Sequence, residues 1–243
     1  MSIDYSQVDS ILLLGDSITE MGFQPGGFVQ RLAVVYQRRL DVVNRGLGGY
    51  NTDWLLPIAE KVVSNTLIKG SSKIRLVVIW MGTNDSVLEG MPSGQHVPVS
   101  RYKKNLLAMY SLYPSSIPTI FITPTPFRHD IWRDRDPKVT AQYGEAAKDL
   151  AKELGVGFVD SQKEFKGKKL EPLLSDGLHL KPAGYEIVFD AFMRLIREKH
   201  PELAPERLPC ALPSWDDHDM RDAGYKYAME REAAESSNLS KQE

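Results

Sequence analysis

The sequence contains a single cysteine, Cys210, among 243 residues. One thiol cannot form an intramolecular disulfide, and it cannot supply the clustered thiolates of a cysteine-based metal site. A low cysteine content is typical of proteins in a reducing compartment. The cysteine count therefore excludes a disulfide-stapled scaffold, and we expect a fold that is held together by its apolar core.

The chain also lacks a long apolar run and a strong net charge. A membrane-spanning helix needs about 20 consecutive apolar residues, whereas the first apolar run, at 11–14, ends before Asp16. No basic residue precedes that run, so we expect no signal peptide. The formal net charge of −2 creates no overall field that would favour nucleic acid or an anionic membrane. We therefore expect a cytoplasmic protein without a nucleic-acid partner or a membrane span.

The charge is distributed unevenly along the chain. Residues 200–243 contain ten Asp and Glu against five Lys and Arg, a net charge of −5, which leaves +3 for residues 1–199. Prolines at 201, 205, 209 and 213 interrupt the start of this acidic part. A charged helix over 216–235, packed on the body or on a partner, is expected after them. The sequence thus predicts a domain over 1–199 and a proline-rich, then charged, extension over 200–243.

Short apolar segments alternate with amphipathic segments along the first 199 residues. The segments predicted to be strands are 11–14, 41–44, 74–81, 119–123 and 156–159. The segments predicted to be helices are 28–40, about 52–63, 100–113, 138–154 and 183–199. Strands that alternate with helices form a parallel sheet through right-handed crossovers. We therefore expect an α/β fold with a five-stranded parallel sheet and helices on both faces.

The first predicted strand leads directly into Gly15, Asp16 and Ser17. Its unbroken apolar run indicates burial on both faces, and Gly15 ends it. Ser17 then lies just beyond the carboxyl end of the strand, where open α/β sheets bind ligands. A serine at this place can act as a nucleophile if a base and an oxyanion site reach it. The alternative is that Asp16 and Ser17 merely cap the next helix.

Other polar turns follow later strands. Gly49 lies in the turn at 48–52, and Asn84 lies in the turn at 82–85. Because the carboxyl ends of parallel strands share one edge of the sheet, Ser17, Gly49 and Asn84 are predicted to converge. A further segment, at 175–179, places Asp176 three residues before His179 and just ahead of the last predicted helix.

These residue types suit acyl transfer. A serine hydroxyl becomes a good nucleophile when an imidazole takes its proton, and His179 can be that base for Ser17. Asp176 can fix the tautomer of His179 and stabilise the imidazolium. The backbone N–H groups of Ser17 and Gly49 and the side-chain amide of Asn84 can hold the oxyanion of a tetrahedral intermediate. The sequence therefore predicts a catalytic triad and an oxyanion hole.

In order along the chain, Gly15-Asp16-Ser17, Gly49, Gly82-Thr83-Asn84-Asp85 and Asp176-Gly177-Leu178-His179 resemble the conserved blocks of the SGNH/GDSL hydrolases. The stretches at 44–52, 92–98 and 175–179 are similar to those of the isoamyl acetate-hydrolysing esterases in particular. The resemblance covers about residues 10–199. It implies a flavodoxin-like three-layer α/β/α sandwich, ester hydrolysis without a cofactor or a metal ion, and a homodimer.

Several assignments around this constellation remain open. Gly46 and Gly48 are alternatives to Gly49 as the source of the inward N–H. Asp16 and Asp85 are expected to support their turns through hydrogen bonds to the backbone.

The sequence also leaves alternatives for the residues that line the substrate site. An acyl or alcohol pocket could be lined by four large residues, Trp80, Met81, Phe127 and Trp132. The first two of these equally suit the core of the sheet. The segment 128–135 is either a flap near the site or a charged loop.

The sequence favours a serine esterase that acts on small carboxylic esters, in particular acetates of short alcohols. A second reading in the same fold is deacetylation of a sugar or of another acetylated metabolite. A third reading, of another class, is a non-catalytic binding module whose acidic tail recruits a partner.

Overall fold

The computed structural model describes residues 8–69, 73–212, 214–216 and 218–239. Its centre is a five-stranded sheet in the order β2-β1-β3-β4-β5, and every neighbouring pair of strands is parallel. The strands are β1 (Ser10–Gly15), β2 (Asp41–Gly46), β3 (Ile74–Trp80), β4 (Thr119–Ile122) and β5 (Gly157–Val159). The predicted α/β fold with a five-stranded parallel sheet is confirmed.

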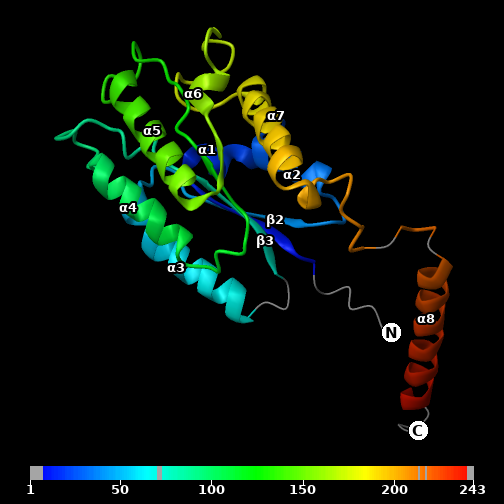
Figure 1. Cartoon of the computed structure of the whole chain (residues 1–243). Coiled ribbons are helices and arrows are strands. Elements are labelled where there is room, and N and C mark those ends of the chain that lie inside the picture. The colour runs from blue at the N-terminus through cyan, green and yellow to red at the C-terminus, as the bar shows by residue number, and fades with distance from the viewer. Residues whose placement is uncertain (1–7, 70–72, 213, 217, 240–243) are drawn as a thin grey trace.

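Helices cover both faces of the sheet, so the fold has three layers (Figure 1). The helices are α1 (Ser17–Glu20), α2 (Phe28–Val35), α3 (Thr52–Lys69), α4 (Val99–Tyr110), α5 (Pro137–Leu154), α6 (Ser161–Glu164), α7 (Pro182–Lys199) and α8 (His218–Leu239), with the 3₁₀ turns η1 (Met21–Phe23) and η2 (Pro201–Leu203). On one face α2 packs beside α7, and on the other α3, α4 and α5 lie side by side.

Successive side chains of the strands point to opposite faces of the sheet and pack into two separate apolar cores. In β1, Ile11 and Leu13 face the core under α2 and α7, whereas Leu12 and Leu14 face the core under α3, α4 and α5. All four side chains are at most 1% exposed. The first strand is therefore buried on both faces, as its unbroken apolar run predicts, and its carboxyl end is fixed from both sides.

The helix predicted over 28–40 is shorter than expected, because α2 ends at Val35. Tyr36 turns into the core, and its hydroxyl donates to the carbonyl of Leu203 at 2.9 Å. Arg38 then adopts a φ of 63°, which no α-helix accommodates. The chain therefore leaves the helical conformation before residue 40, and periodicity alone does not reveal this break.

Packing also continues beyond residue 199, the expected end of the folded domain. Leu203 and Ala204 are 2% and 1% exposed and belong to the core under α2 and α7. Further along, the N–H of Ala211 donates to the carbonyl of Arg38 at 2.7 Å. Residues 200–212 are therefore part of the packed body, and the boundary at 199 does not mark where packing ends.

The charged helix expected over 216–235 corresponds to α8. The side chains of α8 that the structure describes are exposed, and the helix lies away from the sheet and its flanking helices in Figure 1. Among the described residues, no helix has both the length and the apolar character needed to cross a membrane.

Candidate active site

Ser17 lies at the point where β1 turns into α1. Asp16 caps this short helix, and its Oδ1 accepts a hydrogen bond from the N–H of Ile18 at 2.9 Å. A Cβ on Gly15 would lie 2.0 Å from Oγ1 of Thr19, so only glycine allows α1 to fold back this closely on the strand. Asp16 is thus the helix cap, and Ser17, 7% exposed, begins the helix at the carboxyl edge of the sheet.

Ser17, His179 and Asp176 form one hydrogen-bonded chain. The hydroxyl of Ser17 lies 2.8 Å from Nε2 of His179, although the two residues are 162 positions apart. Nδ1 of the same imidazole lies 2.7 Å from Oδ2 of Asp176. A carboxylate at Nδ1 favours the tautomer that carries its proton there, so Nε2 is left to accept the proton of the serine. The structure therefore brings the three predicted triad residues together in the order that acyl transfer needs.

The loop that carries Asp176 and His179 is held by its own backbone. Oδ1 of Asp176 accepts from the N–H groups of Leu178 and His179, both at 2.9 Å, while Ser175 N–H donates to the carbonyl of His179 at 2.8 Å. Partial burial tends to raise the pKa of Asp176. The backbone and imidazole hydrogen bonds outweigh that effect and lower the pKa below 3.8. Asp176 is therefore ionised at neutral pH and fixed beside the imidazole.

Asn84 and the turn at 48–51 lie beside the serine. The amide nitrogen of Asn84 donates to the carbonyl of Tyr50 at 2.8 Å, which fixes the orientation of the amide group. A Cβ on Gly48 would lie 3.9 Å from Cβ of Ser17, so this turn borders the nucleophile. The turn thus lies between the serine and the asparagine and contacts both.

The structure reduces the number of glycines whose N–H can serve as the backbone donor to the oxyanion. The N–H of Gly46 donates to Oδ1 of Asn44 at 2.8 Å, and it is therefore engaged elsewhere. Gly49 has a φ of 78°, in the left-handed region that favours glycine. Gly48 and Gly49 remain as the sources of a donor, and Gly49 stays the predicted one.

Two buried carboxylates support the turns around the site. Asp16 and Asp85 are both 0% exposed, and Oδ1 of Asp85 accepts from the N–H of Thr52 at 2.9 Å and from the Thr52 hydroxyl. Desolvation raises the pKa of Asp16 to about 6 and that of Asp85 to about 7, against the lowering effect of these hydrogen bonds. Both carboxylates bond backbone groups, which is the arrangement expected of turn supports.

The four residues predicted to line a substrate pocket lie partly in the sheet and partly in the segment beside the triad loop. Trp80 and Met81 are each 1% exposed and lie in the two opposite cores, so they match the core reading. Phe127 is 5% exposed, and its ring packs edge-on to His129. Nε1 of Trp132 donates to the carbonyl of Asp176 at 3.0 Å. The rings of Phe127 and Trp132 both lie near the guanidinium carbon of Arg135, at 6.0 and 5.0 Å.

The segment 128–135 is packed against the triad loop. The N–H of Arg128 donates to the carbonyl of Gly177 at 2.7 Å. At its other end Arg135 is 2% exposed, pairs with Asp134 at 3.2 Å and lies 5.0 Å from the ring centre of Trp132. It is therefore a tethered loop rather than a freely exposed charged one. Sequence reasoning missed Arg135 as a buried cation, and the aromatic residues around it were the available signal.

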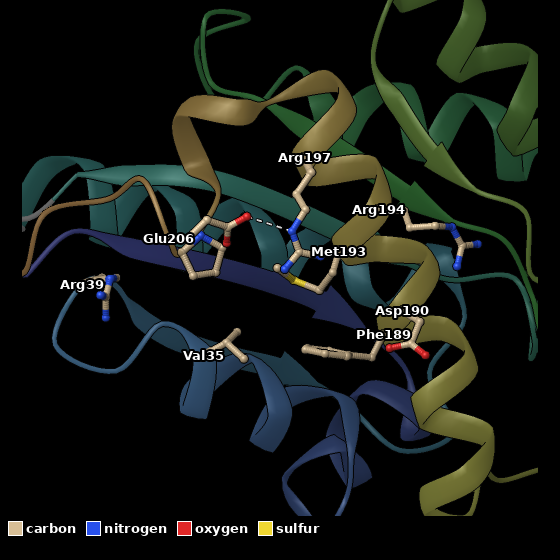
Figure 2. Close-up of a pocket in the computed structure, with 9 residues that line it drawn as sticks. Val35, Arg39, Phe189, Asp190, Met193, Arg194, Arg197 and Glu206 are labelled. Carbon is tan, nitrogen blue, oxygen red and sulfur yellow. Dashed lines mark hydrogen bonds and ion pairs between the residues drawn. The ribbon is translucent and has the colours of Figure 1, made fainter.

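Two cavities are relevant to the site, one away from the triad and one beside it. A cavity of about 690 Å³ between α2, α7 and the chain at 205–206 is lined by apolar side chains and by charged ones (Figure 2). Arg197 pairs with Glu206 across it at 2.8 Å, and none of the triad residues lines it. A cavity of about 170 Å³ is lined by Asp176, Gly177 and Arg128 and borders the triad loop. In the part of the chain that the structure describes, no group of three or more His, Cys, Asp or Glu side chains is placed to hold a metal ion.

Comparison with known proteins agrees with this geometry. Residues 13–187 match the model of the GDSL-like lipase/acylhydrolase family. The human isoamyl acetate-hydrolyzing esterase 1 homolog is 35% identical over 225 residues, which cover 85% of this chain and 87% of that relative. The isoamyl acetate-hydrolyzing esterase of Schizosaccharomyces pombe is 31% identical over 222 residues, covering 89% of this chain and 87% of the relative.

Solved structures share the fold. A lipase/acylhydrolase from Enterococcus faecalis superimposes with a TM-score of 0.66 at 23% identity, covering 85% of this chain and 100% of that one. An acetylxylan esterase from Geobacillus stearothermophilus superimposes with a TM-score of 0.62 at 25% identity, covering 81% of this chain and 96% of that one.

Proposed function

The chain belongs to the GDSL-like lipase/acylhydrolase family and is a carboxylic ester hydrolase, and from this premise we propose that it cleaves small acetate esters through Ser17, His179 and Asp176. The observation that carries the proposal is the hydrogen-bonded chain from the Ser17 hydroxyl through His179 to Asp176, with links of 2.8 and 2.7 Å. Membership in a family of ester hydrolases sets aside a purely non-catalytic binding module.

In the acylation half-reaction, Oγ of Ser17 attacks the carbonyl carbon of the ester while Nε2 of His179 takes the hydroxyl proton. The carbonyl oxygen becomes an oxyanion, and the imidazolium is stabilised by the ionised Asp176. Collapse of the tetrahedral intermediate breaks the bond to the alkoxy group. His179 gives its proton to that leaving alcohol, and the acyl group stays on Ser17.

In the deacylation half-reaction, a water molecule takes the place of the alcohol. His179 removes a proton from this water, whose oxygen attacks the acyl carbon and forms a second tetrahedral intermediate. Collapse breaks the bond to Oγ, and the proton returns from His179 to Ser17. The carboxylic acid leaves, and the enzyme is restored.

The oxyanion of both intermediates is held by the N–H groups of Ser17 and Gly49 and by the amide of Asn84. Asn84 gives one N–H to Tyr50, and we assign its second N–H to the oxyanion. Each such donor is worth about 2.7–4 kcal/mol of transition-state stabilisation in hydrolases of this kind. The sites of these donors at one edge of the sheet support the assignment.

The names of the relatives support an acetate ester of a short alcohol as the substrate. The fission yeast relative is called an isoamyl acetate-hydrolyzing esterase and the human relative is called a homolog of one, and each is at least 31% identical over most of this chain. A second candidate substrate is an acetylated carbohydrate, which the acetylxylan esterase at 25% identity favours. The same triad would remove an acetyl group in either case.

A comparison of kcat/KM on p-nitrophenyl acetate, isoamyl acetate and acetylated xylo-oligosaccharides tests both substrate candidates. We expect turnover of the first two to exceed that of the carbohydrate, and the reverse order would select the second candidate. The Ser17→Ala variant should lose activity by about 10⁴-fold or more, because the covalent route is closed. Ser111→Ala, which removes a hydroxyl bonded to the carbonyl of Leu107 at the end of α4, is the matched control.

A further inference from the structure

Three side-chain amides hold the turn that carries Gly49. Nε2 of Gln95 donates to the carbonyl of Gly49 at 2.8 Å, and the amide of Asn84 donates to the carbonyl of Tyr50 at 2.8 Å. The amide of Asn51 donates back to the carbonyl of Gln95 at 2.9 Å. Gln95 and this turn therefore hold each other by a reciprocal pair of hydrogen bonds across 44 to 46 residues of sequence.

The loop that supplies Gln95 is itself fixed to the body. The next residue, His96, bonds through Nδ1 to the carbonyl of Val87 at 2.7 Å. Val97 is 0% exposed, its N–H donates to the carbonyl of Asp85 at 3.1 Å, and its carbonyl accepts from the hydroxyl of Tyr143 at 2.6 Å. Gln95 thus reaches the turn from an anchored point in the protein.

Gly49 depends on hydrogen bonds to its turn because glycine has no side chain that could pack and fix its backbone. Its φ of 78° is one of several that glycine adopts with little cost. The nearest atom that a Cβ there would meet is Nε2 of Gln95, at 3.7 Å. The hydrogen bond from Gln95 fixes the carbonyl of Gly49, which lies in the peptide plane that follows the residue. Only φ and ψ of Gly49 separate this plane from the one that carries its N–H, so the bond restrains the direction of that N–H.

We propose that Gln95 is a positioning residue for the oxyanion hole, which acts by restraining the turn at Gly49 through its carbonyl and does not touch the substrate. This inference rests on the proposed ester hydrolysis at Ser17. A donor that is preorganised needs no rearrangement when the oxyanion forms, whereas a loosened donor loses that advantage. A displacement of about 1 Å in a catalytic group can cost about 100-fold in rate.

The first test replaces Gln95 by methionine, which has a similar length and no donor. We expect kcat on p-nitrophenyl acetate to fall by about 10- to 100-fold, with KM changed less than about twofold, because the lost support matters most in the transition state. Gln162→Met is the matched control. Gln162 also donates its side-chain amide to a backbone carbonyl, that of Pro124 at 3.3 Å, and it is likewise half-buried.

The second test separates positioning from simple packing through a pH signature. In Gln95→Glu the ionised carboxylate has no proton to donate to the carbonyl of Gly49, whereas the protonated acid has one. The ratio of the variant's kcat to that of the wild type should therefore rise as the pH falls from 8 to 5. A glutamine that only filled space would give a flat ratio.

The outcomes separate the two proposals. A kcat of Gln95→Met within twofold of the wild type, or a flat pH ratio for Gln95→Glu, would overturn the role of Gln95 while Ser17→Ala remained inactive. Full activity of Ser17→Ala would instead overturn the proposed function and the role of Gln95 together. Thermal melting above the assay temperature shows that each variant is folded. If Gln95→Met does not fold, the pH ratio of Gln95→Glu decides.

Discussion

Trp132 lies edge-on to the imidazole of His179, with ring centroids 6.4 Å apart and ring planes at 82°. The indole also donates from Nε1 to the carbonyl of Asp176 at 3.0 Å. The guanidinium carbon of Arg135 lies 5.0 Å from the centre of the same indole. Trp132, which lies outside the triad, thus contacts both the proposed base and the aspartate that orients that base. The buried guanidinium of Arg135 packs against the indole.

Replacement of Trp132 by phenylalanine keeps a ring beside the imidazole and removes the N–H that bonds Asp176. A hydrogen bond of this kind contributes about 0.5–1.5 kcal/mol, so we expect kcat to fall by no more than about tenfold. Trp215→Phe, at a site that is 80% exposed, is the control. A rise in KM with an unchanged kcat would show instead that Trp132 is a wall of the substrate pocket.

Asp176→Asn should be far more damaging than its small change in shape suggests. The asparagine oxygen can still accept from the N–H groups of Leu178 and His179, but its amide would face Nδ1 and favour the wrong tautomer of the imidazole. The corresponding change in another Ser-His-Asp hydrolase lowers kcat by about 10⁴-fold, and we expect a loss of about 10³- to 10⁴-fold. Steady-state kinetics measures this loss. The control is Asp149→Asn, which changes an exposed carboxylate paired with Lys152. Equal activity of the two variants would contradict the role of Asp176.

The strands and the polar turns were predictable because their signals are local. The unbroken apolar run of β1 and the glycine, serine and asparagine that follow strands each require only neighbouring residues to be recognised. The shared edge of a parallel sheet then brings Ser17 and Asn84 together without any knowledge of distant contacts. His179 follows from its spacing to Asp176.

The remaining features depend on contacts that no local pattern encodes. The hydroxyl of Tyr36, just beyond α2, bonds the carbonyl of Leu203, and the support of Gly49 comes from Gln95, more than 40 residues away. For Trp80 and Met81 the sequence left a pocket and the sheet core open, and the alternation of an extended chain favours the core. Successive side chains point to opposite faces, so these two neighbours enter opposite cores.

The packing of residues 200–212 predicts where the chain can be shortened. A chain that ends at residue 216 should melt within about 3 °C of the full chain, because surface changes rarely alter stability by more than about 0.5 kcal/mol and the described side chains of α8 are exposed. Leu203→Ala in the full chain should lower the free energy of unfolding by about 2–5 kcal/mol, since this side chain is 2% exposed in the core. Thermal melting and chemical unfolding of both variants beside the full chain provide the measurements. The reverse order of destabilisation would show that α8, and not the segment before it, stabilises the body.

The buried carboxylate of Asp85 predicts a dependence of stability on pH. Burial raises its pKa from 3.8 to about 7, so between these values the folded chain holds a proton that the unfolded chain releases. The stabilisation is complete below pH 3.8 and is lost as the pH rises through 7. Asp85→Asn removes this titration, while its side-chain oxygen can still accept from the N–H and the hydroxyl of Thr52.

The free energy of unfolding of Asp85→Asn relative to the wild type should therefore rise between pH 5 and pH 7, by up to about 1.4 kcal/mol per pH unit. Urea unfolding at several pH values measures this difference, in which the other titrating groups largely cancel. Asp149→Asn, whose carboxylate is 58% exposed, should give a difference that does not change with pH over this range. Parallel stability profiles for the wild type and Asp85→Asn would mean that this carboxylate is already ionised in the folded protein at pH 5. Its negative charge would then have to be balanced inside the turn that holds Thr52.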